Sequence, residues 1–398
     1  MPEPFWEDGL RDDMPEIPLK IQYLPPPVAN NGDSTIAVGS GPRLHPLGFP
    51  SAGTSTSCRC QVVRSLGRWS AGLKYPETSA YDAWVYAISR AERYIYVEQQ
   101  YFISNMGEKG ARNRIAEAIL RRVEWAVDKS RPFRVYVVIP ERPNSEAVSY
   151  FTRRTLLQDG SDNSGKKKLC LRSRISAVLR TAREGTHWHG SDADRVLSVC
   201  TLYSAGRSVS GRWDVGDVYV HSKVLVCDDN VAVIGSANVN DRSFSGDGDS
   251  ELGVIIWDGE SENQVTGAVR DFRLRLWRQY LGFQVDGSQD RKISDPSSDS
   301  AYGEWTRTSQ KNLSLLTSVT NFTPRDTITS FRQWNSLLSK YDHKSPEKKS
   351  AALDRPERLV EMRGQLVKYP IMFLSDQRKR GIVEHFTTTS SLVKEYFL

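Results

Sequence analysis

The sequence contains few cysteines and no long apolar run, and both shortages exclude whole classes of protein. Only five of the 398 residues are cysteines, an odd number spread from Cys58 to Cys227, which argues against a disulfide framework. We therefore expect reduced thiols and a cytoplasmic protein. No apolar stretch approaches the roughly 20 residues that cross a bilayer. The first residues, MPEPFWEDGLRDD, are acidic and proline-rich, unlike a secretory signal.

The sequence also lacks a large excess of charge of one sign. The 54 Lys and Arg residues exceed the 48 Asp and Glu residues by six. This excess favours an anionic partner, but it does not require nucleic acid, and we expect none, because net charge informs about association and not about fold. The hydrophobic content of 38% is sufficient for a globular core.

The composition divides the chain into three regions. Residues 1–57 hold ten of the 19 prolines and are rich in Gly and Ser, so they cannot bury enough apolar surface and are expected to form a loop or linker. Residues 58–285 alternate between strand and helix patterns. Residues 286–398 are more polar, with helical patches, and are expected to form a helical extension and tail that pack on the preceding region.

The pattern of residues 58–285 predicts an α/β fold. Strands are expected at CRCQVVRS (58–65), YIYVEQQYF (94–102), RVYVVI (134–139) and ELGVIIW (251–257), and amphipathic helices at 115–127 and 265–281. The last helix should stop at Gly282, because glycine commonly ends helices. Strand, helix and strand in this order favour a sheet with helices packed on it.

The densest signal is DVYVHSKVLVCDDNVAVIGSANVNDRS, residues 217–243. Two β-rich runs flank a turn-prone Asp-Asp-Asn sequence, which predicts a β-hairpin. If Asp229 and Asn230 form a two-residue turn, the residue numbers of cross-strand partners sum to 459.

This register predicts which polar side chains meet. It places Lys223 opposite Ser236 and His221 opposite Asn238. His221 and Lys223 lie two residues apart and share one face of the strand, so four polar groups would converge. Asp228 lies seven residues from His221 and would point to the other side.

The assembled residue types suit a phosphodiester. Histidine titrates near pH ~6.5 and can act as a nucleophile or as a proton donor. The Lys223 ammonium can offset anionic charge, and Ser236 and Asn238 can donate hydrogen bonds to phosphate oxygens. The Glu251 carboxylate could orient and polarise the His221 imidazole. This chemistry requires neither a metal nor a cofactor.

A simpler interpretation is a hairpin whose His and Lys side chains line a solvated face. A lone His-x-Lys pair would favour that interpretation. Here the polar residues recur at fixed offsets from His221 to Arg242, and this spacing favours the functional interpretation.

Residues 221–238 match, without a gap, the HKD signature His-x-Lys-x4-Asp-x6-Gly-Ser-x-Asn. The chain therefore resembles the phospholipase D superfamily. The stretches RSLGRWSAGLKY, YIYVEQQYFIS, RVYVVIP, RLRLWRQYLG and RGQLVKYPIMFLSD are similar to the C-terminal half of eukaryotic signalling phospholipase D. The resemblance covers roughly residues 58 to 380.

The resemblance implies a phospholipase D-type sandwich, in which a mixed β-sheet is flanked by helices. It also implies hydrolysis of phosphatidylcholine to phosphatidic acid and choline through a phosphohistidine. The catalytic set would be His221, Lys223, Asp228 and Glu251, with His221 protonating the leaving alcohol and then activating water. Lys223, Ser236 and Asn238 would bind the phosphate, and Asp228 looks structural.

The family builds one active site from two HKD motifs, whereas this sequence contains one. The resemblance therefore implies one of the two usual halves, a partial chain that needs a second HKD half or a homodimer. The expected partner is a phospholipid membrane surface, to which the protein would bind peripherally from the cytoplasm. Two alternatives are a catalytically inactive regulatory or membrane-phosphate-binding protein, and a dimeric single-HKD nuclease.

Overall fold

The computed structural model describes residues 58–376, except for 107–110, 143–145, 162–164, 183–187, 189–191, 210, 259, 262–263, 266, 322, 340–349 and 351–352. The described residues belong to one compact unit, Ser57–Leu398. The expected linker at 1–57 and the end of the expected tail, 377–398, lie outside the described residues.

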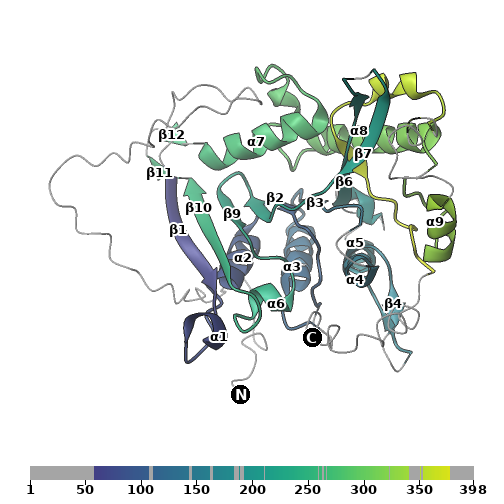
Figure 1. Cartoon of the computed structure of the whole chain (residues 1–398). Helices are drawn as coiled ribbons and strands as arrows, with labels where there is room; N and C mark the ends of the chain where they lie inside the picture. Colours follow the sequence, from purple (N-terminus) through teal and green to yellow (C-terminus); the bar gives the residue numbers. More distant parts are fainter. Residues whose placement is uncertain are drawn as a thin grey trace. The chain divides into compact units, whose positions relative to one another are not determined.

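A mixed nine-stranded sheet forms the centre of this unit (Figure 1). Its strands, in spatial order, are β1 (Cys58–Ser65), β10 (Glu251–Asp258), β9 (Val231–Gly235), β8 (Val224–Cys227), β2 (Tyr94–Glu98), β3 (Arg134–Val138), β6 (Leu197–Arg207) and β13 (Leu366–Lys368), with β7 (Trp213–Val218) also paired to β6. The pairs β2–β3 and β3–β6 are parallel, and the remaining pairs in this sheet are antiparallel. The expected α/β class with a mixed sheet is confirmed. Two small ribbons pair β4 (Gly160–Ser161) with β5 (Lys167–Lys168), and β11 (Glu260–Ser261) with β12 (Gln264–Val265).

Helices cover both faces of the sheet (Figure 1). The α-helices are α1 (Arg68–Ala71), α2 (Ser79–Arg90), α3 (Ile115–Asp128), α4 (Glu146–Leu156), α5 (Leu171–Thr181), α6 (Asp241–Phe244), α7 (Ala268–Leu281), α8 (Asp299–Val319) and α9 (Phe331–Leu338). The 3-10 helices are η1 (Ala193–Arg195), η2 (Asp290–Ile293) and η3 (Pro356–Glu361). Helices α7 and α8 lie on one face, and α2, α3 and α5 lie on the other. In the part of the chain that the structure describes, no helix combines the length and the apolar character needed to span a bilayer.

An aromatic core fixes α7 and α8 to the sheet. Side chains alternate along a strand, so Tyr96 of β2 and Tyr136 of β3 point to the same face. There they meet Trp277 of α7 and Trp305 of α8, whose ring centroids lie 4.6 Å apart. All four side chains are buried. Edge-on aromatic pairs add about 0.5–1.5 kcal/mol each to area burial, so this cluster ties the later part of the chain to the sheet.

The C-terminal region joins the same sheet through β13. The β-like run at residues 366–374 forms a strand only over Leu366–Lys368, which pairs with β6. The Asn312 amide of α8 donates hydrogen bonds to the backbone carbonyls of Arg363 and Leu366, both at 2.8 Å. Because Asn312 is buried, these bonds satisfy a polar group that would otherwise destabilise the fold.

The connection between β8 and β9 has three residues, not the two that the sequence suggested. Cys227 pairs with Val231, and residues 228–230 form the turn. Asp228 and Asp229 both adopt the left-handed conformation, with φ of 58° and 60°. Aspartate tolerates this region better than most residues, because its short side chain can bond locally.

The Asp228 carboxylate anchors this turn to the start of β2. It accepts the backbone N–H groups of Glu92, Arg93 and Tyr94 at 2.6, 2.9 and 2.8 Å. Hydrogen bonds to a charged group contribute about 1.5–3 kcal/mol each. The geometry of the turn therefore depends on a carboxylate at this position.

We expect Asp228→Asn to lower the free energy of unfolding by about 2–4 kcal/mol, because an amide presents N–H groups to backbone donors and carries no charge. Urea unfolding of the purified chain measures this loss. Asp128→Asn is the matched control, since Asp128 is exposed at the end of α3, and it should remain near the wild-type stability. Equal stability of the two variants would contradict the anchoring role.

Candidate active site

The sequence motif lies at one edge of the sheet, which we call the motif edge. It comprises the end of β2, the segment that leads into β8, and the end of β9. Strand β8 begins at Val224, opposite Glu98 of β2, so His221 and Lys223 belong to the segment just before β8. Ser236 and Asn238 follow the last residue of β9, Gly235, at the same edge.

His221 is exposed at this edge. Its ring stacks on Tyr219, with centroids 6.2 Å apart and planes at 27°. Burial and the nearby Lys223 charge lower the pKa of His221 from its ordinary value of 6.5. The imidazole is therefore mostly neutral at pH 7, the form that can take up a proton or attack an electrophile.

Lys223 brings a buried cation to the same place. Its side chain is 6% exposed, and its ammonium donates to the His221 carbonyl oxygen at 2.6 Å and to Gln100 Oε1 at 3.2 Å. Burial lowers the pKa of Lys223, and the Glu251 carboxylate acts in the opposite direction. Because an ammonium has three N–H donors, one remains for a substrate oxygen.

The predicted hairpin register is wrong by one residue. Cross-strand partners sum to 458, as in 227 + 231, and the Gly235 N–H donates to the Lys223 carbonyl oxygen at 3.1 Å. Lys223 therefore lies opposite Gly235 and not opposite Ser236, and the expected pairing of His221 with Asn238 is also absent from the ladder. The extra turn residue, which both left-handed aspartates make possible, causes the shift.

Glu251 holds the serines of the motif and not the histidine. One carboxylate oxygen accepts the Ser236 hydroxyl at 2.5 Å, and the other accepts the Ser243 hydroxyl at 2.6 Å. Within the described residues, no hydrogen bond joins Glu251 to His221, so the expected orientation of the imidazole by this carboxylate is not found. Both oxygens are engaged by hydroxyls, which makes Glu251 a positioning residue for Ser236.

Asn238 is held by Tyr101. The amide Nδ2 donates to the Tyr101 hydroxyl at 3.0 Å, and the buried Oδ1 has no partner among the described residues. Because Nδ2 carries two N–H groups, one remains for a phosphate oxygen.

Four consecutive residues, Glu98 at the end of β2 and the three that follow it, hold the motif edge, and the sequence pattern did not identify them as site residues. Glu98 accepts the Ser222 hydroxyl, Gln99 bonds the backbone at Ala237 and Val239, Gln100 accepts from Lys223 and donates to Tyr219, and Tyr101 bonds Asn238. The expected strand at 94–102 ends at Glu98, which leaves this segment free to turn toward the motif. Three polar residues inside an otherwise buried apolar run were the signal, since buried polar groups need partners.

Asp228 lies at the other end of β8 from His221. It contacts the backbone of the turn partners described above and none of the polar side chains of the motif edge. Asp228 is therefore a positioning residue that holds the turn after β8 against the start of β2. In the described part of the chain, no three His, Cys, Asp or Glu side chains are grouped as a metal site.

Gly235 allows β9 to approach β10 closely. A Cβ at this position would lie 2.7 Å from both the Gly253 Cα and the Leu252 carbonyl oxygen. We expect Gly235→Ala to lower the free energy of unfolding by about 1–3 kcal/mol and to displace Ser236. Gly206→Ala is the matched control, because a Cβ there meets no atom within 4 Å, and thermal unfolding should show little change. A tolerated Gly235→Ala would contradict the close packing.

The charge of Lys223 should be visible in the titration of His221. Removing a nearby cation makes the protonated imidazole less unfavourable, so Lys223→Gln should raise the pKa of His221 from its lowered value. Proton–carbon NMR titration measures this pKa, with His221→Asn to assign the signal. Lys311→Gln, which removes an exposed cation of α8, should leave it unchanged. An unchanged or lower pKa in Lys223→Gln would contradict the coupling.

Comparison with known proteins supplies an independent line of evidence. A family model described as phospholipase D matches residues 54–158 and 203–327. Phospholipase D zeta 1 of Arabidopsis thaliana is 34% identical over 366 residues, covering 83% of this chain and 32% of that protein. Human phospholipase D1 is 33% identical over 354 residues, covering 84% and 30%. The chain thus spans about a third of the length of these curated relatives.

Solved structures show a weaker likeness. Nuc, a phospholipase D family member from Salmonella typhimurium, matches with 18% identity and a TM-score of 0.30, covering 56% of this chain and 93% of Nuc. NucT from Helicobacter pylori matches with 12% identity and a TM-score of 0.28, covering 55% and 95%.

Proposed function

Because the chain belongs to the phospholipase D family, we propose that its motif edge is one half of a phosphodiesterase active site. One observation carries the proposal: an exposed imidazole of lowered pKa beside a buried ammonium, at the edge where Ser236 and Asn238 also lie. These groups can bind a phosphodiester and exchange a proton with it. The reaction would be hydrolysis of phosphatidylcholine to phosphatidic acid and choline.

The charge arrangement suits a histidine that transfers protons. A bound phosphodiester anion would stabilise the imidazolium and so raise the pKa of His221 toward neutrality. His221 could then donate its proton to the choline oxygen as the phosphorus–oxygen bond breaks, while a histidine of the second half forms the bond to phosphorus. The neutral His221 next removes a proton from the water that breaks the phosphorus–nitrogen bond, which releases phosphatidic acid.

The anion would be held by three groups. The remaining N–H of the Lys223 ammonium would face the developing negative charge, and the second N–H of Asn238 Nδ2 would add a neutral donor. Ser236 is exposed, but its hydroxyl donates a hydrogen bond to Glu251, so it would bind the substrate only after rotating away from the carboxylate. Lys223 and Asn238 could therefore bind the phosphate without first breaking a hydrogen bond, unlike Ser236.

The mechanism needs a second imidazole. The sequence contains one HKD motif, so the other histidine would come from a second HKD half or from a second copy of this chain. A half-site that lacks the nucleophile loses far more than the 10²–10⁴-fold that proton transfer alone contributes. We therefore propose that the isolated monomer is nearly inactive.

We further propose peripheral binding to the cytoplasmic side of a membrane. Trp69 in α1 and Tyr75 just after it are each 71% exposed, and Lys74 Nζ lies 5.2 Å from the Tyr75 ring centroid. Exposed aromatic residues beside basic ones suit the interface of an anionic lipid layer. All five cysteines are free, which is consistent with a reducing compartment.

A second candidate is a phosphate-binding protein without turnover. It is favoured by one observation: the sequence contains one HKD motif, and none of the five histidines other than His221 has a lysine two residues further on. The same motif edge would then bind a lipid phosphate and hold it.

Choline release from phosphatidylcholine vesicles separates the two candidates. We expect release to rise more than linearly with chain concentration, because two motif edges must meet, and His221→Asn to lower it by at least about 100-fold. Asp128→Asn should release choline at the wild-type rate. Activity that survives in His221→Asn would refute the assigned role, and vesicle binding without release at any concentration would favour the second candidate.

A further inference from the structure

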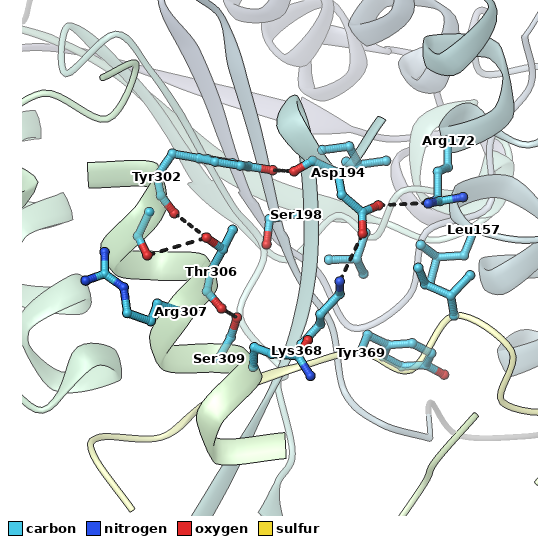
Figure 2. A pocket seen from close by; sticks show the side chains of 15 residues that line it. Leu157, Arg172, Asp194, Ser198, Tyr302, Thr306, Arg307, Ser309, Lys368 and Tyr369 are labelled. Atoms are coloured by element: carbon cyan, nitrogen blue, oxygen red, sulfur yellow. Dashed lines mark hydrogen bonds and ion pairs between the residues drawn. The ribbon is translucent and has the colours of Figure 1, made fainter. Parts of the chain in front are cut away.

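A cavity of about 500 Å³ lies away from the motif edge, beside β6 and β13 (Figure 2). Its walls come from α5, η1, the first residues of β6, α8 and the end of β13. It shares no lining residue with the motif edge. Its volume falls in the range of roughly 300–1,000 Å³ that is usual for small-molecule sites.

One carboxylate organises the charged wall of this cavity. Asp194 accepts Arg172 Nε at 2.9 Å on one oxygen and Lys368 Nζ at 2.9 Å on the other. Figure 2 shows the two cations on either side of this carboxylate. Each of the three side chains is about one-third exposed, so the group is open to a ligand and not sealed in the core.

The two cations retain unused hydrogen-bond donors. In the described part of the chain, Arg172 bonds only through Nε and Lys368 only through one N–H. Both terminal nitrogens of the guanidinium and two ammonium protons therefore have no protein acceptor. With Asp194 ionised, the three side chains carry a net charge of +2 − 1 = +1, and both cations lower the pKa of this carboxyl group.

Apolar side chains form part of the remaining wall, beside polar residues of α8 such as Thr306 and Arg307. Leu157, Val199 and Ile371 line it, together with the ring of Tyr302, whose hydroxyl is occupied by the Asp194 carbonyl oxygen at 2.7 Å. A small inorganic anion would leave these walls in contact with water. A ligand that joins an anionic head to an apolar body would cover both parts.

We propose that this cavity binds a phosphomonoester that carries an apolar portion. The guanidinium fork of Arg172 matches two phosphate oxygens, and the Lys368 ammonium matches a third. Asp194 acts as the positioning residue that holds both cations in place before the ligand arrives. The head could belong to a lipid or to a free ester, and the proposal does not depend on the activity at the motif edge.

Isothermal titration of the full chain tests this site with two probes, sn-glycerol 3-phosphate and dihexanoyl phosphatidic acid, and with glycerol as the uncharged control. We expect both phosphomonoesters to bind, dihexanoyl phosphatidic acid more tightly because of the apolar walls. Arg172→Gln and Lys368→Gln should each weaken binding at least tenfold. Lys368→Arg keeps a charged donor and should retain binding, which separates lost recognition from lost folding.

Two control variants locate the site. Arg332→Gln removes an exposed cation of α9, and Arg270→Gln removes an exposed cation of α7; both should bind as the wild type does. The proposal is overturned if neither phosphomonoester binds, if glycerol binds equally, or if binding is lost in Lys223→Gln and kept in Arg172→Gln. Tighter binding of the lipid probe supports a ligand with an apolar portion, whereas tighter binding of glycerol phosphate overturns that part of the proposal.

Discussion

The arrangement of the motif edge depends on the need of buried polar side chains for hydrogen-bond partners. Glu98 ends the fully buried strand β2, Gln99 and Gln100 follow it, and all three are buried. An unsatisfied group there would cost about 1–3 kcal/mol, and each finds its partner on the loops that carry the motif. The hydrogen bonds of this segment, more than strand pairing, therefore fix where Lys223 lies. The exposed His221 ring projects from the same segment as Lys223.

Carboxylates organise this protein at four separate places. Glu98 gathers two tyrosine hydroxyls and a serine, Asp228 fixes the turn, Asp194 joins two cations, and Glu251 joins two serines. In each case the carboxylate only accepts hydrogen bonds and holds the donors of other residues in a defined geometry. Chemistry or binding is then left to the positioned groups. This division explains the places of the two acidic residues that were expected to take part in catalysis. Glu251 contacts the phosphate-binding residue Ser236, whereas Asp228 anchors the turn. Among the described residues, neither carboxylate is hydrogen-bonded to His221.

Local patterns predicted the elements of the sheet well. The strand at 58–65 appears with those bounds, the expected strand at 134–139 ends one residue earlier, and the last helix of the sheet region stops at Gly282 in the left-handed conformation. Such features follow from periodicity and from glycine, both of which are local properties. The contact of Glu251 with Ser243 and the anchoring of Asn238 by Tyr101 join distant segments, so no local pattern could have predicted them.

The error in the predicted register shows that the length of one turn decides which side chains of the motif face each other. A turn of two residues would have paired Lys223 with Ser236, whereas three residues place Lys223 against Gly235. Because side chains alternate with a period of two, a shift of one residue changes which groups face each other. The residue types of the motif were identified correctly, but the way in which they meet came from the tertiary structure.

A crystal structure of the chain with tungstate, a tetrahedral oxyanion that scatters X-rays strongly, tests the central claim most directly. The account predicts an oxyanion at the motif edge, within hydrogen-bond distance of Lys223 Nζ and Asn238 Nδ2 and facing the His221 imidazole. A motif edge without the oxyanion at saturating tungstate, or with His221 turned away from it, would contradict the account.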